Sequence, residues 1–377
     1  MFIVLWAMVG YPVVLIGLDK VFKRENKKDY LYEPTVTIMI VAHNEEKVIE
    51  KKLLNILEIE YPLRKLEVIV TSDASTDSTD EIVNRFIQSH SDANIYLHKT
   101  KSHYGKTNAQ NEAQELCRSE ILVMTDANAM FEKNAVKELV ASFTDSDIAY
   151  VTGRLCYVNT GANNTANSEG LYWKLDLMCR RIESRIQTIT AGNGAIYAVR
   201  NNDYIKINPI DCHDLSFPME YALKQKRAIY NQDAIAYEKA GEKDEDEFNR
   251  KTRMSRAILR EICPSIRVFN VFRCHWFSFF YFGHRTCRYL LWLAHFVLLA
   301  VNVSLLTINN GWFWKATISV QIFFYIMATI GWITKREGKI FRFPFYYCMT
   351  VAAQWKGVFN IMMRKSKPVW EKAESTR

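Results

Sequence analysis

The stretch that decides the fold runs from Val36 to Glu46 and reads Val-Thr-Ile-Met-Ile-Val-Ala-His-Asn-Glu-Glu. Seven apolar and β-branched residues are followed at once by polar ones, which is typical of a buried strand that ends at a sheet edge. Two later runs repeat this pattern, and they end in Thr71-Ser72-Asp73-Ala74-Ser75 and Thr125-Asp126-Ala127-Asn128. Helical patterns follow the three runs near residues 48–57, 79–90 and 133–143. This alternation predicts βαβ units in a mostly parallel sheet, with ligands beyond the carboxyl ends of its strands.

The polar residues at these strand ends narrow the chemistry. No GxGxxG or GxxxxGK[ST] sequence occurs there, which disfavours a dinucleotide oxidoreductase and a P-loop NTPase. Asp73 is suited to accept a hydrogen bond from a nucleobase or ribose. Asp126 and Asn128, two residues apart in an extended segment, would place two oxygen ligands on one Mg²⁺ or Mn²⁺ ion. Each residue could instead be a helix cap or turn residue.

Long uncharged runs flank this α/β region and predict membrane helices. Residues 1–18 and 316–334 carry no charge, and residues 289–314 carry none around a polar break at Asn309-Asn310-Gly311. A cleaved signal peptide or a buried helical hairpin are the alternatives. Five basic residues between positions 20 and 28 place the following domain in the cytoplasm, by the positive-inside rule. We expect an integral membrane protein, of the bacterial inner membrane type.

The expected domains follow from these runs. They are a transmembrane helix at 1–19, a catalytic domain at 33–260, an interfacial amphipathic helix at 264–284, a transmembrane hairpin at 287–334, an interfacial, re-entrant or transmembrane helix at 340–363, and a basic tail at 364–377. The net charge of +8 fits basic clusters beside anionic lipid, and no nucleic-acid-binding motif accompanies it.

The ordered motifs resemble the membrane-integrated branch of family 2 glycosyltransferases, which includes cellulose, hyaluronan and poly-N-acetylglucosamine synthases. The resemblance rests on Val-Ala-His-Asn-Glu, Ser-Asp-Ala-Ser-Thr-Asp, Gly-Lys-Thr-Asn-Ala and Thr-Asp-Ala-Asn, and it covers about residues 36–260. It implies a GT-A fold, which is a Rossmann-like nucleotide-sugar-binding α/β sheet. It also implies an inverting transfer from a nucleotide sugar, most simply a UDP-sugar, with Mg²⁺ or Mn²⁺.

The resemblance assigns roles to individual residues. It implies that Asp214 is the general base and that Asp126 and Asn128 hold the metal. The implied nucleotide-sugar contacts are Ala42, Asn44, Glu45, Asp73, Lys106, Asp126, Arg250 and Arg253. The implied acceptor contacts are Gly192, Asn193, Gly194, His213 and Met254. Arginine suits a diphosphate because its planar fork binds phosphate oxygens in pairs.

Two positions depart from the family pattern. His213 stands where an acid usually precedes the base, and Met254 stands where processive enzymes carry a tryptophan. The second departure weakens the case for a processive polymerase. His213-Asp214 could alternatively be a helix cap, and the basic residues from Arg250 to Arg256 could be a solvated helix face or a lipid-headgroup site.

The predicted function is therefore an inverting glycosyltransferase that extends a surface or extracellular polysaccharide at the inner face of the membrane. The alternatives are a single-addition transferase with a polyprenyl-linked acceptor, and an inactive glycosyltransferase-like assembly subunit. The expected partners are a UDP-sugar, a polysaccharide or lipid-linked saccharide, membrane lipid, and either further copies of the chain or export proteins.

Overall fold

The computed structural model describes residues 1–158, 164–241, 244–308, 311–334 and 338–369. One mixed sheet of eight strands forms the centre of the α/β domain, in the order β3-β2-β1-β4-β7-β6-β8-β5. The strands are β1 (Val36–Ala42), β2 (Leu66–Ser72), β3 (Ile95–Lys99), β4 (Ile121–Asp126), β5 (Met130–Phe131), β6 (Ile148–Tyr157), β7 (Ile196–Arg200) and β8 (Arg227–Glu238). The runs that begin at Val36, Leu66 and Ile121 therefore form neighbouring strands.

The sheet is mixed, and most of its strands run in one direction. Strands β1, β2, β3 and β4 pair in parallel, and Val36 lies opposite both Leu66 and Ile121. Strand β7 then runs antiparallel to both β4 and β6, and β5 runs antiparallel to β8. Strand β8 pairs in parallel with β6, so six strands share one direction. The prediction of a mostly parallel sheet is therefore confirmed, and the exceptions are β7 and the short β5.

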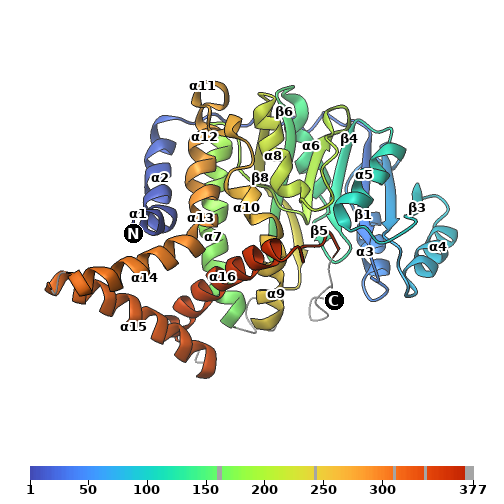
Figure 1. Ribbon diagram of the computed structural model, residues 1–377. Coiled ribbons are helices and arrows are strands. Elements are labelled where there is room, and N and C mark those ends of the chain that lie inside the picture. The colour runs from blue at the N-terminus through green and yellow to red at the C-terminus, as the bar shows by residue number, and fades with distance from the viewer. Residues whose placement is uncertain (159–163, 242–243, 309–310, 335–337, 370–377) are drawn as a thin grey trace.

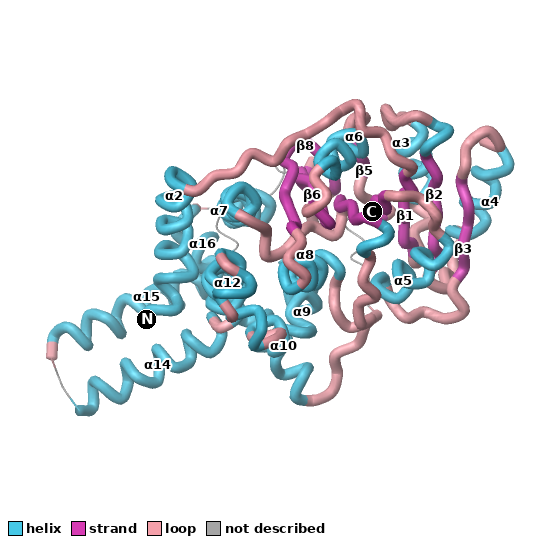
Figure 2. The backbone as a smooth tube through the Cα atoms, turned by 90° about the horizontal axis from the view of Figure 1, so that it is seen from above, coloured by secondary structure: helices cyan, strands magenta, loops and turns pink. Residues whose placement is uncertain are grey.

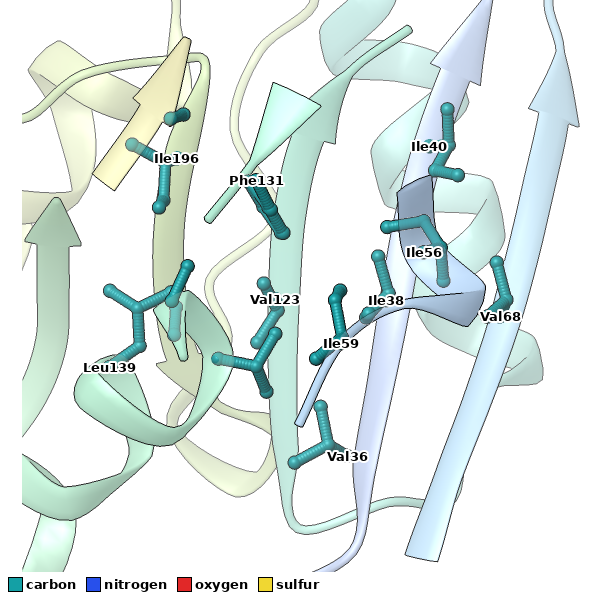
Figure 3. Close-up of a cluster of buried hydrophobic side chains, with 14 of the residues drawn as sticks. Val36, Ile38, Ile40, Ile56, Ile59, Val68, Val123, Phe131, Leu139 and Ile196 are labelled. Atoms are coloured by element: carbon teal, nitrogen blue, oxygen red, sulfur yellow. The ribbon is translucent and has the colours of Figure 1, made fainter. Parts of the chain in front are cut away.

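Helices on both faces bury the central strands. In β1, Val36, Ile38 and Ile40 face the core beneath α3 (Ile49–Leu57), α4 (Thr79–Ser89) and α6 (Ala135–Ala141), as Figure 3 shows in part. Met39 points to the other face, beneath α5 (Lys106–Leu116) and α8 (His213–Leu223). A strand that is buried on both faces has a nearly continuous run of apolar residues, so β1 is easy to recognise in the sequence.

Three helical segments are long and apolar enough to cross a membrane by length and composition. They are Phe2–Val21, which comprises α1 (Phe2–Leu5), η1 (Trp6–Gly10) and α2 (Tyr11–Val21), together with α14 (Leu291–Ile308) and α15 (Trp312–Thr334). Helices α14 and α15 project from the α/β domain as a hairpin (Figures 1 and 2). The break expected at Asn309-Asn310 lies outside the described residues.

The last helix, α16 (Lys339–Met362), is not among the candidate spans. It packs against α15 and against α9 (Asp244–Met254) of the α/β domain. Its Arg342 forms an ion pair with Asp244, and its Tyr346 hydroxyl donates to Glu247. Whether this helix lies in the membrane surface stays a prediction, and residues 370–377 of the basic tail lie outside the described residues.

The expected interfacial helix at 264–284 is wrong as a single element. The segment forms η6 (Ile266–Phe269), α11 (Val271–Cys274), α12 (Trp276–Phe280) and the start of η7 (Tyr281–Thr286), which α13 (Cys287–Tyr289) follows. Asn270 caps α11 with its side chain, and His275 has a φ of 52°, so the chain turns at both points. Phe272 is 91% exposed, whereas Phe277 is buried. The segment therefore exposes some of its apolar side chains and packs others in the interior.

The remaining helical elements connect these parts. The long helix α7 (Asn164–Ile186) lies beside α2 and packs against β8. Helix α10 (Ile258–Ile262) follows α9, and short 3₁₀ turns occur at Leu63–Lys65, Ser142–Thr144, Asn201–Asp203 and Ser255–Ala257. Helix α7 therefore joins the α/β domain to the first candidate span.

Candidate active site

Lys106 is the centre of the candidate site. It is the first residue of α5 and follows Gly105, whose φ of 92° suits a residue without a side chain. Its ammonium group contacts the carboxylate of Asp126 at the end of β4, and it donates to the carbonyl of Gly194 at 2.9 Å. The strand end, the helix start and the Gly192-Asn193-Gly194 loop therefore meet, as the sequence predicts.

Asp214 reaches the same place from α8. A Cβ atom built on Gly194 would lie 3.4 Å from the Lys106 nitrogen and 3.7 Å from an Asp214 carboxylate oxygen. The amide of Gly192 donates to the Asp214 carbonyl at 2.6 Å, so the predicted acceptor loop and the predicted base are bonded directly. Lys106, Asp126, Gly194 and Asp214 thus form one cluster with a basic group between two acids.

The Gly192 loop is tightly packed from behind. A Cβ on Gly192 would lie 1.7 Å from the Tyr150 hydroxyl, and Tyr150 is fully buried. The amide of Asn193 donates to the Thr152 hydroxyl at 2.9 Å, and Arg180 of α7 donates to the Gly192 carbonyl. A side chain at position 192 would collide with Tyr150, so glycine is required there. The collision and the hydrogen bonds together fix the position of the loop.

The Asp73 carboxylate is buried and hydrogen-bonded to other groups of the protein. It accepts from the amides of Gly105 at 2.8 Å and Tyr104 at 3.1 Å. The Nδ1 atom of His103 lies 2.8 Å from the same carboxylate, and the His103 ring stacks on His43 with centroids 3.7 Å apart. Asp73 thus shapes the loop that leads into Lys106. Its contact with a nucleobase stays a prediction.

Ala42, Asn44 and Glu45 join the ends of β1 and β2. The carbonyl of Ala42 accepts from the Asp73 amide at 2.8 Å. Asn44 has a φ of 55°, and its side-chain oxygen accepts from the Thr76 amide at 2.7 Å. The Glu45 amide donates to the hydroxyl of Thr79, the first residue of α4, at 2.8 Å. These three residues set the shape of the strand-end loops.

The geometric reason given for the paired metal ligands is wrong. Asp126 is the last residue of β4, and residues 127–128 form a turn that the Ala129 amide closes on the Asp126 carbonyl at 3.2 Å. The two side chains therefore do not alternate as in an extended strand. The Asn128 amide donates instead to Glu238 of β8 at 2.7 Å. Among the described residues, no group of three or more His, Cys, Asp or Glu side chains is placed to hold a metal.

Asp126 alone still fits a hard cation. Its carboxylate is 34% exposed beside Lys106, and carboxylate oxygens suit Mg²⁺ and Mn²⁺. An ion held by one protein carboxylate would take its other oxygens from a diphosphate and from water, as Mg²⁺ commonly does in nucleotide sites.

Lys52 is a residue of this site that the sequence did not reveal. It belongs to α3 and is fully buried, where its ammonium group donates to the Thr125 hydroxyl at 3.0 Å and to the Ala129 carbonyl. It also lies 4.0 Å from the centre of the Phe131 ring. Burial lowers the pKa of Lys52 to about 7, although nearby Asp126 acts in the opposite direction. Lys52 thus anchors the turn that follows Asp126. A lysine within an amphipathic helix pattern looks like a surface residue, so only its burial identifies it.

The two predicted diphosphate-binding arginines differ. Burial lowers the pKa of Arg253, with Arg250 and Arg256 adding to the effect, whereas Asp126 and Cys212 oppose it. Arg253 is therefore close enough to the Lys106 cluster to interact with Asp126. Arg250 instead forms two hydrogen bonds with Glu247, at 2.6 and 2.8 Å, and lines a separate cavity beneath the site. Met254 is 49% exposed and lines the same cavity.

His213 belongs to the core rather than to an open acceptor site. It is 3% exposed, stacks on Phe217, and lies within hydrogen-bond distance of the hydroxyls of Tyr197 and Tyr204. Burial, with a smaller effect of Lys106, lowers the pKa of His213 to about 3. The His213 ring therefore has almost no exposed surface with which to contact an acceptor, contrary to the prediction.

Arg256 and the end of the chain close one side of the site. Arg256 donates to the carbonyls of Ile210 at 2.7 Å and Pro368 at 3.0 Å. A Cβ on Gly105 would lie 2.6 Å from the same Pro368 carbonyl. The segment after α16 therefore lies against the loop that precedes Lys106, a contact that sequence reasoning did not foresee.

Comparisons with known proteins agree with this architecture. Residues 37–206 match the protein family described as Glycosyl transferase family 2. The chain is similar to the mannosyltransferase PcManGT of Pyrobaculum calidifontis, whose structure was solved with GDP-Man and Mn²⁺. The TM-score is 0.70 at 21% identity, and the alignment covers 94% of this chain and 96% of the other.

Two curated relatives extend the comparison. The chain is 27% identical over 163 residues to a beta-monoglucosyldiacylglycerol synthase of Nostoc sp., covering 43% of this chain and 35% of that protein. It is 24% identical over 158 residues to a hyaluronan synthase of Streptococcus pyogenes, covering 41% of this chain and 37% of that protein. The matches thus span about a third of the length of these relatives. The chain contains a family 2 glycosyltransferase domain with the GT-A fold, which confirms the predicted class.

Proposed function

We propose that this chain transfers a sugar from a nucleotide-diphosphate donor to a saccharide acceptor at the membrane, with inversion at the anomeric carbon. The observation that carries the proposal is the cluster of Lys106, Asp126, Gly194 and Asp214 at the carboxyl ends of the strands. In this proposal Asp214 is the base and Asp126 is the metal-binding carboxylate, and Lys106 lies near both. The donor is proposed to be a UDP-sugar, as the family motifs imply.

Each residue of the cluster has one task in this reaction. The Asp214 carboxylate takes the proton of an acceptor hydroxyl while that oxygen bonds to the anomeric carbon and the bond to the diphosphate breaks. Lys106 and Arg253 neutralise the negative charge that develops on the departing diphosphate. A Mg²⁺ or Mn²⁺ ion at Asp126 would supply further charge neutralisation when bound. The Gly192 loop holds the base in place through its hydrogen bond to Asp214.

The acceptor is proposed to be a saccharide that stays at the membrane, either a growing polysaccharide or a lipid-linked saccharide. The names of the two relatives support both classes, one lipid and one polysaccharide. The three candidate spans support a membrane location, for which we propose the bacterial inner membrane with the catalytic domain in the cytoplasm.

The test is transfer by the purified full-length chain in detergent, with Mn²⁺ and Mg²⁺ and a panel of donors that includes UDP-sugars and GDP-mannose. Asp214→Asn is expected to lower sugar transfer by about 10³-fold while donor binding is kept, because the variant retains the shape of the side chain but cannot take the proton. Unchanged transfer would reject Asp214 as the base. No nucleotide release by the unaltered chain with any donor would favour an inactive assembly subunit.

A further inference from the structure

A cavity of about 400 Å³ lies where the α/β domain meets the candidate membrane helices. Its walls come from η1, α7, α9, η5, η7, α13, α14 and α16, so residues from both ends of the chain enclose it. A cavity of this size is within the range that binds small organic molecules. None of the residues of the Lys106 cluster lines it.

One wall of the cavity is apolar and belongs to the membrane-side helices. Met8 and Val9 come from the first candidate span, Leu291 begins α14, and Phe343 and Val351 come from α16. These segments are the ones whose outer surfaces expose large apolar residues, as Val9 and Phe343 do at 56% and 51%. The apolar wall is thus continuous with surfaces suited to lipid.

Another part of the lining is basic. Five basic side chains belong to it, namely Arg180, Arg250, Lys251, Arg285 and Arg288, and among the described residues the acid that lines the cavity is Asp176. Arg180 and Arg288 both bond to Asp176, at 2.6 and 2.8 Å. Burial acts to raise the pKa of Asp176, but Arg180 and His284 outweigh it and hold this pKa well below its usual range. Asp176 is therefore charged and is shared by two arginines.

Acids that do not line the cavity also interact with these basic side chains. Glu183 interacts with Arg285 and accepts a hydrogen bond from Tyr11 at 2.6 Å, and Glu247 bonds to Arg250 and Lys251. Glu261 interacts with Arg285 as well. The feature that favours an anion is therefore a particular donor group in the cavity, not a count of charges.

Arg285 provides such a donor group. It is 8% exposed, and its Nε donates to the Thr190 hydroxyl at 3.1 Å. Its Nη2 atom is buried without a hydrogen-bond partner in the described part of the chain. A buried guanidinium nitrogen that lines a cavity without a partner is suited to a phosphate oxygen, since guanidinium groups bind phosphate strongly.

The cavity is also connected to the catalytic cluster. Arg180, which lines the cavity, donates to the Gly192 carbonyl, and the Gly192 amide donates to Asp214. Met254 lines the cavity one residue after Arg253, which interacts with Asp126. The cavity is thus linked to the loop that holds Asp214 through one side chain, that of Arg180.

We infer that this cavity binds the phosphate and the first isoprenoid or alkyl units of a lipid-linked saccharide acceptor. The lipid phosphate lies against Arg285 and its neighbours, the chain lies against the apolar wall, and the attached sugar extends toward Asp214. A phosphate carries at least one negative charge and accepts hydrogen bonds from guanidinium groups, so it can pair with the Arg285 Nη2 atom. A neutral diacylglycerol would leave that atom without an ionic partner. The inference rests on the proposed function for the direction of the sugar, but the cavity's choice of ligand can be tested without transfer.

The test measures binding of a short-chain prenyl phosphate to the purified full-length chain in detergent, by isothermal titration. The same-chain prenyl alcohol, diacylglycerol, phosphatidylglycerol and inorganic phosphate are the comparison ligands. The prenyl phosphate is expected to bind at least about tenfold more tightly than each of them, because it alone combines one unhindered phosphate with a single chain. Equal binding of the alcohol would overturn the inference, and so would tighter binding of phosphatidylglycerol or of inorganic phosphate.

Two variants and one control locate the site. Arg285→Gln removes the charge, and Thr350→Trp fills the cavity from α16 without removing a charge. Both are expected to weaken prenyl phosphate binding at least about tenfold. Thr329→Trp places the same side chain at an exposed threonine of α15 that does not line the cavity, and it should bind as the unaltered chain does. If Thr350→Trp is folded by its thermal transition and binds normally, the cavity is not the site.

Nucleotide release from the donor alone separates this inference from the proposed function. Thr350→Trp is expected to keep donor hydrolysis while it loses lipid binding. Selective lipid binding with no donor hydrolysis by any form would reject the proposed function and keep the cavity assignment. Donor hydrolysis without selective lipid binding would do the reverse.

Discussion

The strand-end cluster and the basic cavity are built in different ways from the same kinds of residues. In the cluster, Asp126 and Lys106 are placed by a strand end and a helix start, and backbone amides and carbonyls make many of the supporting bonds. In the cavity, side chains of helices distant in sequence are held by other side chains, as Asp176 is by Arg180 and Arg288. The first arrangement suits a reaction whose geometry must be exact to a fraction of an ångström. The second suits a flexible ligand that needs charge and apolar contact.

The largest expected effect comes from Asp126. Asp126→Ala is expected to lower sugar transfer by about 10³-fold and to remove its dependence on Mn²⁺, because the metal loses its protein ligand. Asn128→Ala should cost less than about tenfold, since the Asn128 amide is bonded to Glu238. Transfer assays over a Mn²⁺ titration measure both, with the exposed Asp92→Ala as control. If the cluster and the cavity are separate, prenyl phosphate binding stays unchanged, whereas metal-dependent turnover in Asp126→Ala would reject the metal site.

A smaller effect is expected from the loop that joins the two regions. Gly192→Ala forces a methyl group against the buried Tyr150 hydroxyl and displaces the loop bonded to Asp214. A shift of about 1 Å at the reacting groups lowers transfer by about 10²-fold. Gly17→Ala is the matched control, because a Cβ there meets nothing within 4 Å. Normal kcat in Gly192→Ala would show that the loop does not position the base.

Lys52 tests whether the cluster depends on its buried support. Lys52→Met leaves the Ala129 carbonyl without its lysine partner, which is expected to lower the free energy of unfolding by about 1–3 kcal/mol. It should also raise the Mn²⁺ concentration needed for half-maximal transfer by about tenfold, because the turn after Asp126 loses its anchor. The exposed neighbour Lys51→Met should change neither quantity. A loss of stability with an unchanged Mn²⁺ response would make Lys52 purely structural.

The smallest effect concerns acid stability behind Asp214. The folded-state pKa of His213 is about 3, whereas an unfolded histidine titrates near 6.5. The unfolded chain therefore takes up a proton first as the pH falls, so this stability is present above about pH 6.5 and is lost progressively toward pH 3. At pH 5 the loss is about 2 kcal/mol. Thermal unfolding of His213→Gln between pH 7 and 5 should show a correspondingly smaller decrease, and an identical decrease would assign the acid sensitivity to other groups.

The sequence predicted β1, β2, β4 and the mostly parallel sheet, but it did not predict the reversed strand β7. Strand β1 spans Val36–Ala42 as expected, and the three expected helices begin and end within about two residues of their predicted bounds. These elements depend on local periodicity, which the sequence displays directly. The antiparallel insertion of β7 between β4 and β6 depends on pairing between segments about 50 to 75 residues apart, which no local pattern encodes.

The candidate site divides in the same way. Lys106, Asp126 and Asp214 were identifiable because motifs at strand ends and helix starts carry the chemistry together. The buried position of His213, the turn that separates Asn128 from Asp126, and the role of Lys52 were not identifiable. A histidine, an asparagine and a lysine look the same in a sequence whether they face solvent, a ligand or a neighbouring helix.

By itself, the sequence determined the class of the domain, the positions of its main strands and the presence of membrane-length helices, since each follows from short-range composition and spacing. Only the tertiary structure decided which charged residues meet. Asp176 of α7 is more than 100 residues from Arg285 and Arg288 in the sequence. The three side chains meet in the cavity lining because α7 packs against the helices that follow the α/β domain. Burial gives these groups their significance, because a donor without a partner, such as the Arg285 Nη2 atom, costs little in water and much more inside a protein.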